Sequence, residues 1–170
     1  MILKFKLINN FFFRLFDGNK SKDKKIKKWN KELFNFLEKM GKDPEADIHV
    51  NELDNGDIII RKGYILVSIG FIPGEDDNTY INIISPLVYL PQHNFVAIYR
   101  RLLDINDSLN QSSGKFSTHD DYVKLEFSLN IKYLSIELIE YTVLNIIDEA
   151  LSIKAELREE FEVLPYDIWN

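Results

Sequence analysis

The chain contains no cysteine among its 170 residues. This absence excludes disulfides, thiolate nucleophiles and metal sites built on cysteine. Because small secreted domains often depend on disulfides, the absence also favours a reducing compartment, and we expect a cytoplasmic protein. Histidine, the usual general base of enzymes, is scarce as well: the only three are His49, His93 and His119.

Patterns typical of catalytic or ligand sites are missing too. No two histidines have the i, i+4 spacing of a helical metal site, and His119-Asp120 falls in an expected turn. The glycines Gly63, Gly70 and Gly74 do not form a phosphate-binding loop, and no serine lies in a G-x-S-x-G motif. We therefore predict that the protein is not an enzyme and has no catalytic, cofactor-binding or metal-ligating residues and no cofactor.

Positive charge is scarce outside the amino-terminal part. Residues 1–31 contain ten Lys and Arg against two acids, a net charge of +8, and because the whole chain carries −6, residues 32–170 carry −14. A body with this charge repels nucleic acid backbones, so we expect no nucleic acid partner. Its partners are expected to be basic or neutral proteins.

Long apolar runs are also absent. Residues 1–16 include eleven apolar residues, but none of their runs exceeds three, whereas a membrane span needs about 20. We divide the chain into a basic, Phe-rich segment, residues 1–22, and a single domain, residues 23–170. The segment either packs on the domain or lies on an anionic membrane surface as a peripheral anchor. The membrane alternative gives the contact role to Phe11, Phe12, Phe13 and Phe16.

Three stretches have the apolar period of amphipathic helices: residues 23–40, 95–109 and 136–160. Gly41 is expected to end the first helix, Asn94 to cap the second, and Ser135 to cap the third. The first helix has its apolar stripe at Ile26, Trp29, Leu33, Phe36, Leu37 and Met40.

Strands are predicted between these helices. Residues 121–129 alternate strictly, with Val123, Leu125, Phe127 and Leu129 on one face. Pro86 cannot donate to a strand ladder, so its strand is expected to be an edge strand or bulged. Tight turns between strands imply antiparallel pairing. The predicted strands are residues 48–53, 57–61, 64–72, 79–89, 114–118 and 121–129.

The resulting fold class is α+β, an antiparallel sheet with helices packed on it, in the order α-β-β-β(-β)-α-β-β-α. Several landmarks in residues 26–160 resemble the type III secretion chaperone-like fold, and in particular the YbjN and Tir-chaperone-type family. These landmarks are Leu90-Pro91, Tyr99, Leu102-Leu103-x-x-Asn106, Gly114-Lys-Phe116, the alternating residues 123–129 and Ser135-x-Glu-x-Ile139. The basic, Phe-rich start is not part of the family pattern.

The resemblance implies a non-enzymatic, acidic, often dimeric protein that binds other polypeptides. Secretion chaperones hold an extended segment of an effector along their surface, and YbjN-type members are regarded as regulators of sensory transduction. On this basis the leading hypothesis is a protein-binding module, chaperone-like or regulatory, that holds a partner polypeptide on its sheet or helix surface. A membrane-surface adaptor tethered by residues 1–28 is the alternative, and an unrecognised enzyme ranks third.

Two surfaces are candidates for such contacts. Tyr64, Leu66, Tyr80 and Tyr122 are expected on the sheet face opposite Val123, where aromatic residues suit a protein contact. That face is alternatively covered by the second helix or by the amino-terminal segment. On the second helix, the broad apolar arc predicts homodimer contacts, with burial on two sides of its own core as the alternative. The residues of this arc that are assigned to self-association are Phe95, Ile98, Tyr99 and Leu102.

Overall fold

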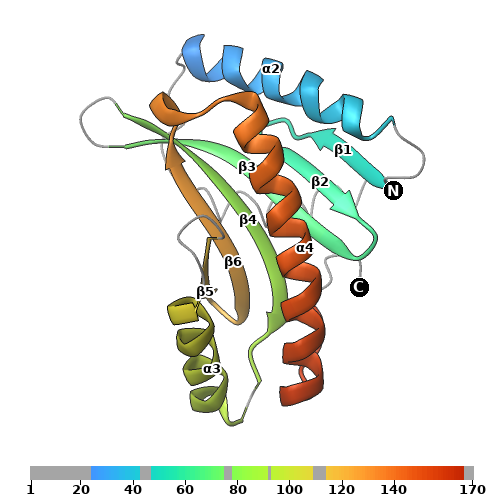
Figure 1. Cartoon of the computed structure of the whole chain (residues 1–170), viewed down its shortest axis with the longest axis vertical. Coiled ribbons are helices and arrows are strands. Elements are labelled where there is room, and N and C mark those ends of the chain that lie inside the picture. The colour runs from blue at the N-terminus through green and yellow to red at the C-terminus, as the bar shows by residue number, and fades with distance from the viewer. Residues whose placement is uncertain (1–23, 43–46, 75–77, 92, 109–113, 167–170) are drawn as a thin grey trace.

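The structure is a computed structural model that describes residues 24–42, 47–74, 78–91, 93–108 and 114–166. In these residues, three helices and one short 3-10 helix accompany a single six-stranded antiparallel sheet (Figure 1). The architecture is therefore the α+β arrangement predicted from the sequence, with helices layered on an antiparallel sheet.

The sheet has the strand order β1-β2-β3-β4-β6-β5. The first four strands follow one another through turns, and helix α3 then separates β4 from β5. Because the β5–β6 hairpin returns with β6 against β4, β1 and β5 become the two edge strands. The strands are β1 Ile48–Glu52, β2 Ile58–Lys62, β3 Ile65–Pro73, β4 Thr79–Tyr89, β5 Lys115–His119 and β6 Tyr122–Asn130.

The helices α2 (Lys24–Met40), α3 (Phe95–Ser108) and α4 (Ile136–Phe161) lie on one face of this sheet (Figure 1). Helix α4 crosses β3 and β4, α2 lies over β1, and α3 lies beside β5. The 3-10 helix η1 (Ile131–Tyr133) leads from β6 into α4. As predicted, Ser135 caps α4: its Oγ accepts a hydrogen bond from the Leu138 N–H at 3.2 Å.

The core forms between the helices and the sheet face that carries Val67, Ile83 and Val123. Its strand residues alternate with period two and its helix residues follow a 3.6-residue period, so both patterns read from the sequence are confirmed. Helix α4 contributes Ile139, Val143, Ile146, Ile147, Ala150, Ile153 and Leu157 to this core.

The opposite sheet face is called the outer face here. The strand register identifies the residues whose side chains share this face, because paired residues on neighbouring strands lie on the same side. It pairs Ile59 with Ser68, Ser68 with Ile84, and Asn82 with Ser128. Leu66 lies two residues before Ser68 on β3 and shares its side. None of the described helices covers this face (Figure 1).

Strand β4 is bulged between Pro86 and Val88, which confirms the second of the two alternatives for Pro86. The strand is interior, not an edge, because β3 and β6 flank it. Beyond Ile84 it no longer pairs with β3, and residues 164–166 occupy the vacated position. There the Tyr89 N–H donates to Leu164 O at 3.0 Å and the Tyr166 N–H donates to Leu87 O at 2.8 Å.

The prediction that Tyr64 starts a strand was wrong. Strand β3 begins at Ile65, and Tyr64 lies with Gly63 in the turn from β2. Gly63 has φ +55°, a left-handed conformation that glycine adopts without strain and that reverses the chain one residue later than the apolar pattern indicates. The side chain of Tyr64 is therefore exposed at the end of the sheet and not on the outer face.

Candidate protein-binding surface

An apolar groove of about 590 Å³ borders the edge strand β1. Ile59 and Leu66 reach it from the outer face, and Ile48 and Val50 belong to β1 itself. Charged and polar side chains form its rim: Glu38, Lys42, His49, Asn51 and Arg61. A concave apolar surface with a mixed polar rim is suited to the side chains of a bound polypeptide.

Helix α2 is held close to the start of β1 by Gly41. A Cβ atom at this position would lie 2.8 Å from the carbonyl oxygen of Ile48, which is closer than side chains and backbone approach one another. The glycine that ends the helix therefore also lets its last turn sit against the strand. Gly41 and Ile48 both line the groove, where α2 meets the sheet.

The free edge of β1 exposes alternate backbone groups. The Leu53 N–H donates to Asp57 O at 2.8 Å, so Leu53 faces β2 with its hydrogen-bonding groups. Antiparallel ladders alternate, and the register pairs Asn51 with Ile59, so Asn51 also bonds toward β2. The N–H and C=O of Val50 and Glu52 then point away from the sheet. In the described residues, no strand pairs with this edge.

The other edge strand is closed by a side chain. Asn106 of α3 donates from Nδ2 to Phe116 O at 2.8 Å, and its Oδ1 accepts from the Phe116 N–H at 2.7 Å. The amide thus imitates the backbone of a neighbouring strand along β5. Unpaired strand edges template pairing with other chains, and this bidentate contact opposes such pairing at Phe116. The two edges therefore differ: Asn106 occupies the outward backbone groups of Phe116 on β5, whereas no described strand pairs with those of Val50 and Glu52 on β1.

The residues predicted for self-association separate into two groups. Ile98 and Leu102 are buried in the core of this chain, so the assignment of a contact role to these two was wrong. The apolar arc of α3 is wider than the sheet can cover. One stripe of the helix therefore packs into the core, and a second stripe faces away from it. The second stripe is exposed and consists of Phe95, Val96, Tyr99 and Leu103.

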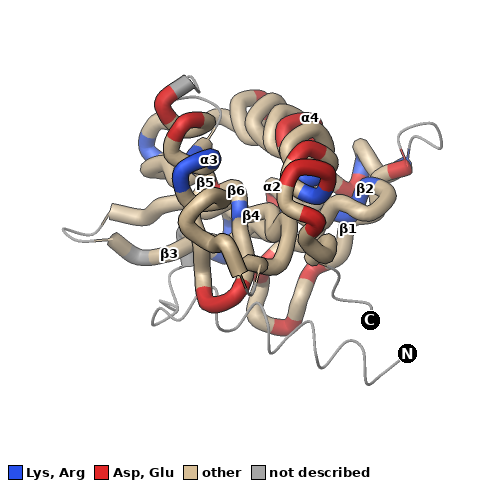
Figure 2. The backbone as a smooth tube through the Cα atoms, turned by 90° about the horizontal axis from the view of Figure 1, so that it is seen from below, with Lys and Arg blue, Asp and Glu red and all other residues tan. Residues whose placement is uncertain are grey.

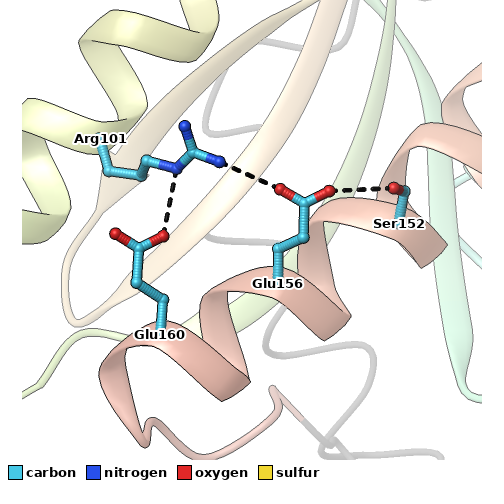
Figure 3. Close-up of polar contacts among 4 residues, drawn as sticks. All are labelled: Arg101, Ser152, Glu156 and Glu160. Atoms are coloured by element: carbon cyan, nitrogen blue, oxygen red, sulfur yellow. Dashed lines mark hydrogen bonds and ion pairs between the residues drawn. The ribbon is translucent and has the colours of Figure 1, made fainter.

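An ionic bridge fixes α3 against the carboxyl-terminal half of α4. The Arg101 guanidinium lies 3.1 Å from Glu156 Oε2 and 3.2 Å from Glu160 Oε2 (Figure 3). Ser152 donates from Oγ to the other oxygen of Glu156 at 3.3 Å. Acidic residues recur along α4 (Figure 2). Arg101 therefore lies where the negative charge of the body is dense, and it holds the exposed α3 stripe in place.

The four residues predicted for a protein contact are not brought together. Leu66 lines the groove beside β1, Tyr80 is half-buried on β4, and Tyr64 lies in the β2–β3 turn. Tyr122 is buried at the far end of the outer face, where its ring packs 4.8 Å from that of Tyr166. Only Leu66 belongs to the groove, and the binding roles of all four stay a prediction.

Tyr122 and Tyr166 form a cluster with Tyr89, whose ring lies 4.9 Å from that of Tyr166. Burial is the main cause that raises the pKa of both Tyr122 and Tyr166 above the ordinary tyrosine value. The nearby carboxylates of Asp120 and Asp121 raise the pKa of Tyr122 further. Both phenols therefore stay neutral, and the cluster attaches residues 164–166 to the sheet.

Two histidines lie near carboxylates on the surface. His49 Nε2 is 3.7 Å from Asp47 Oδ1, and His119 Nε2 is 3.7 Å from Asp120 Oδ2. Across the described ranges, no group of three or more His, Cys, Asp and Glu could hold a metal ion. The same ranges contain no helix long and apolar enough to cross a membrane. Phe11, Phe12, Phe13 and Phe16 lie outside the described residues.

No family model matches the sequence, and no curated protein matches it. A solved structure does match: one chain of the crystal structure of the ExsC–ExsE complex aligns with a TM-score of 0.52 and 17% sequence identity. The alignment covers 76% of this chain and 93% of that chain. The two chains therefore share a fold. At this identity the likeness shows the fold, and function depends on the surfaces described above.

Sequence reasoning missed two residues that shape these surfaces. Asn106 was noted as a landmark of the helix, but its pairing with β5 requires a partner that only the fold supplies. Lys154 was not noticed at all, although it is buried and reaches across to residues far away in the chain. Its one visible signal is a lysine that interrupts the apolar stripe of α4 immediately after Ile153.

Proposed function

We propose that this protein is a non-enzymatic, chaperone-like module that binds a partner polypeptide as an additional strand on β1. The observation that carries the proposal is the difference between the two sheet edges. Asn106 occupies the outward backbone groups of Phe116 on β5, whereas β1 presents those of Val50 and Glu52 beside an apolar groove. Strand addition gives affinity through main-chain hydrogen bonds, and pockets for alternate side chains give specificity.

The chemistry of the partner follows from the groove and from the charge of the body. Ile48 and Val50 lie on the helix-facing side of β1 and favour apolar side chains at the alternate positions of the added strand that share this side. Residues 32–170 carry −14, so basic or neutral segments approach this body faster than acidic ones. The fold likeness supports the proposal, because the matched chain comes from a complex of two proteins.

Val50→Pro is expected to abolish partner binding while leaving the fold intact. Proline removes the N–H that points away from the sheet, and its ring fills the position where a new strand would pair. The β1–β2 ladder keeps its hydrogen bonds because these involve Asn51 and Leu53. The measurement is capture of partners by tagged protein from the source cells, followed by titration of the identified partner with purified protein.

Val50→Thr is the matched control, because it keeps the N–H and nearly the same shape. We expect this variant to bind within about threefold of the parent, and Val50→Pro to lose at least about a hundredfold, the equivalent of several main-chain hydrogen bonds. Equal binding by both variants, with thermal unfolding unchanged, would exclude β1 as the site.

We also propose that the exposed α3 stripe mediates a homodimer. Phe95, Tyr99 and Leu103 lie on one side of the helix, and Leu103 is 68% exposed. The double substitution Leu103→Glu with Phe95→Ser is expected to convert a dimer to a monomer, because it replaces two apolar side chains at the centre of the proposed contact by polar ones. Mass measurement by light scattering tests this, and Asp104→Ala on the same helix is the control. A parent protein that is already monomeric at high concentration contradicts the dimer.

Two narrower assignments are proposals as well. Membership of the YbjN-type family would be supported by related sequences that share the landmarks around Asn106 and Ser135. A peripheral membrane role would depend on residues 1–28, and a cytoplasmic location is the corresponding expectation for the protein-binding role. A vesicle-binding measurement distinguishes this membrane role from packing of the amino-terminal segment on the domain.

A further inference from the structure

The outer face of the sheet is buried although none of the described helices lies on it. Ile59 is 6% exposed, Leu66 is 7% exposed and Ile84 is 2% exposed. These three side chains belong to adjacent interior strands and point away from α2, α3 and α4. Apolar side chains on an open sheet face contact water, so burial of this degree requires a covering layer.

The polar residues of the same face support a cover over its centre. Ser68 is fully buried, and its Oγ finds no hydrogen-bond partner in the described part of the chain. Asn82 Oδ1 is buried in the same way. Ser128, farther along the same face on β6, is exposed. The cover therefore lies over β2, β3 and β4 and does not extend to Ser128.

We propose that residues 1–22 of this chain are the cover. The segment precedes α2 directly, and its first sixteen residues include eleven apolar ones. Sixteen residues as a helix extend about 24 Å, which exceeds the width of the three buried strands at about 4.8 Å per strand. Charge is complementary, since residues 1–22 carry five Lys and Arg against one acid, a net charge of +4, and residues 23–170 carry −10. The cover involves this chain alone and does not depend on a partner at β1.

The absence of native cysteine makes a direct test available. Ser68→Cys and Ser128→Cys place one thiol each at the covered and the open part of the outer face. Labelling by a maleimide is expected to be at least about tenfold slower at position 68 than at position 128 in the folded full-length chain. Replacing Phe11, Phe12, Phe13 and Phe16 by Ser in the full-length chain is expected to remove this difference.

Three controls keep the outcome specific. Lys4→Gln with Lys6→Gln changes the same segment without its apolar groups and should leave position 68 slow. Ala150→Cys lies in the core on the helix side and should stay slow in every variant, which excludes general unfolding. Removal of residues 167–170 should also leave position 68 slow, because the proposal assigns the cover to the other end of the chain.

Fast labelling at position 68 in the parent would overturn the proposal, as would slow labelling that the Phe replacements do not change. If position 68 becomes accessible to the maleimide only when residues 167–170 are removed, the cover is the carboxyl-terminal end, and the proposal fails. Vesicles of anionic phospholipid distinguish the membrane role. If the parent labels rapidly at position 68 and sediments with vesicles through the four phenylalanines, the segment is an anchor and the proposal fails.

Discussion

Lys154→Ala is expected to lower the free energy of unfolding by about 3 kcal/mol, among the largest effects of any single substitution outside the apolar core. Lys154 is 2% exposed, and its Nζ donates to Tyr64 O at 3.3 Å and to Tyr166 O at 3.2 Å. The ammonium also lies 5.4 Å from the centre of the Tyr64 ring. Alanine removes these contacts and leaves two carbonyl groups without their donor.

The consequence is local as well as global. Lys154 joins the β2–β3 turn to residues 164–166, which occupy the position beside β4 that β3 leaves free. Its loss should release residues 164–166 before the rest of the protein unfolds. Urea unfolding measures the global effect, and hydrogen exchange at the Tyr166 and Tyr89 amides measures the local one. For a chain of this size, 3 kcal/mol corresponds to a fall in Tm of roughly 6–12 °C.

Lys154→Met separates packing from hydrogen bonding. Methionine retains most of the aliphatic stem, so it should recover the part of the loss that comes from an empty volume. The hydrogen bonds to Tyr64 O and Tyr166 O remain absent, so exchange at Tyr166 should stay fast. Parental stability in the alanine variant would show that the two carbonyl contacts do not hold the carboxyl-terminal residues.

Asn106→Ala is expected to cost about 2–3 kcal/mol and to open the β5 edge. The side chain makes two hydrogen bonds to the backbone of Phe116, and their loss leaves a donor and an acceptor unsatisfied at a partly buried site. Since the edge strand then resembles β1, the variant should also associate in a concentration-dependent way. Thermal unfolding and sedimentation velocity measure the two effects.

Asp107→Ala is the control for Asn106, because it lies next to it on α3 and is exposed. This variant should keep parental stability within about 0.5 kcal/mol and remain as dispersed as the parent. Asn106→Asp keeps the acceptor for the Phe116 N–H but replaces the donor with a second oxygen facing Phe116 O. Stability at the level of the parent in Asn106→Asp would mean that the second hydrogen bond contributes nothing.

The elements of this fold were largely predictable because they depend on local periods. Four features were predicted correctly, and each depends on residues that are close together in the sequence. They are the apolar stripe on α4, the Ser135 cap, the alternation of β6 and the irregularity at Pro86. The position of Tyr64 was misjudged because an apolar pattern does not reveal where a glycine reverses the chain. The left-handed Gly63 shifts the start of the strand by one residue.

The candidate site depended on contacts that no local pattern contains. The closed edge of β5 needs Asn106 and Phe116 from different elements, and Lys154 bonds to Tyr64 across 90 positions. Likewise, the division of the α3 arc into a buried and an exposed stripe depends on how much of the helix the sheet can cover. Sequence patterning alone gives the arc but not the side that remains free.

Hydrogen exchange at single-residue resolution on β1, with and without the purified partner, tests the central claim most directly. The amides of Val50 and Glu52 point away from β2 and pair with no described strand, so they should exchange quickly in the free protein, while that of Asn51 is already bonded to β2. Binding of the partner should slow Val50 and Glu52 by at least about a hundredfold and leave Asn51 little changed. Protection confined to α3 or to the outer face, with Val50 and Glu52 still exchanging freely in a saturated complex, would contradict it.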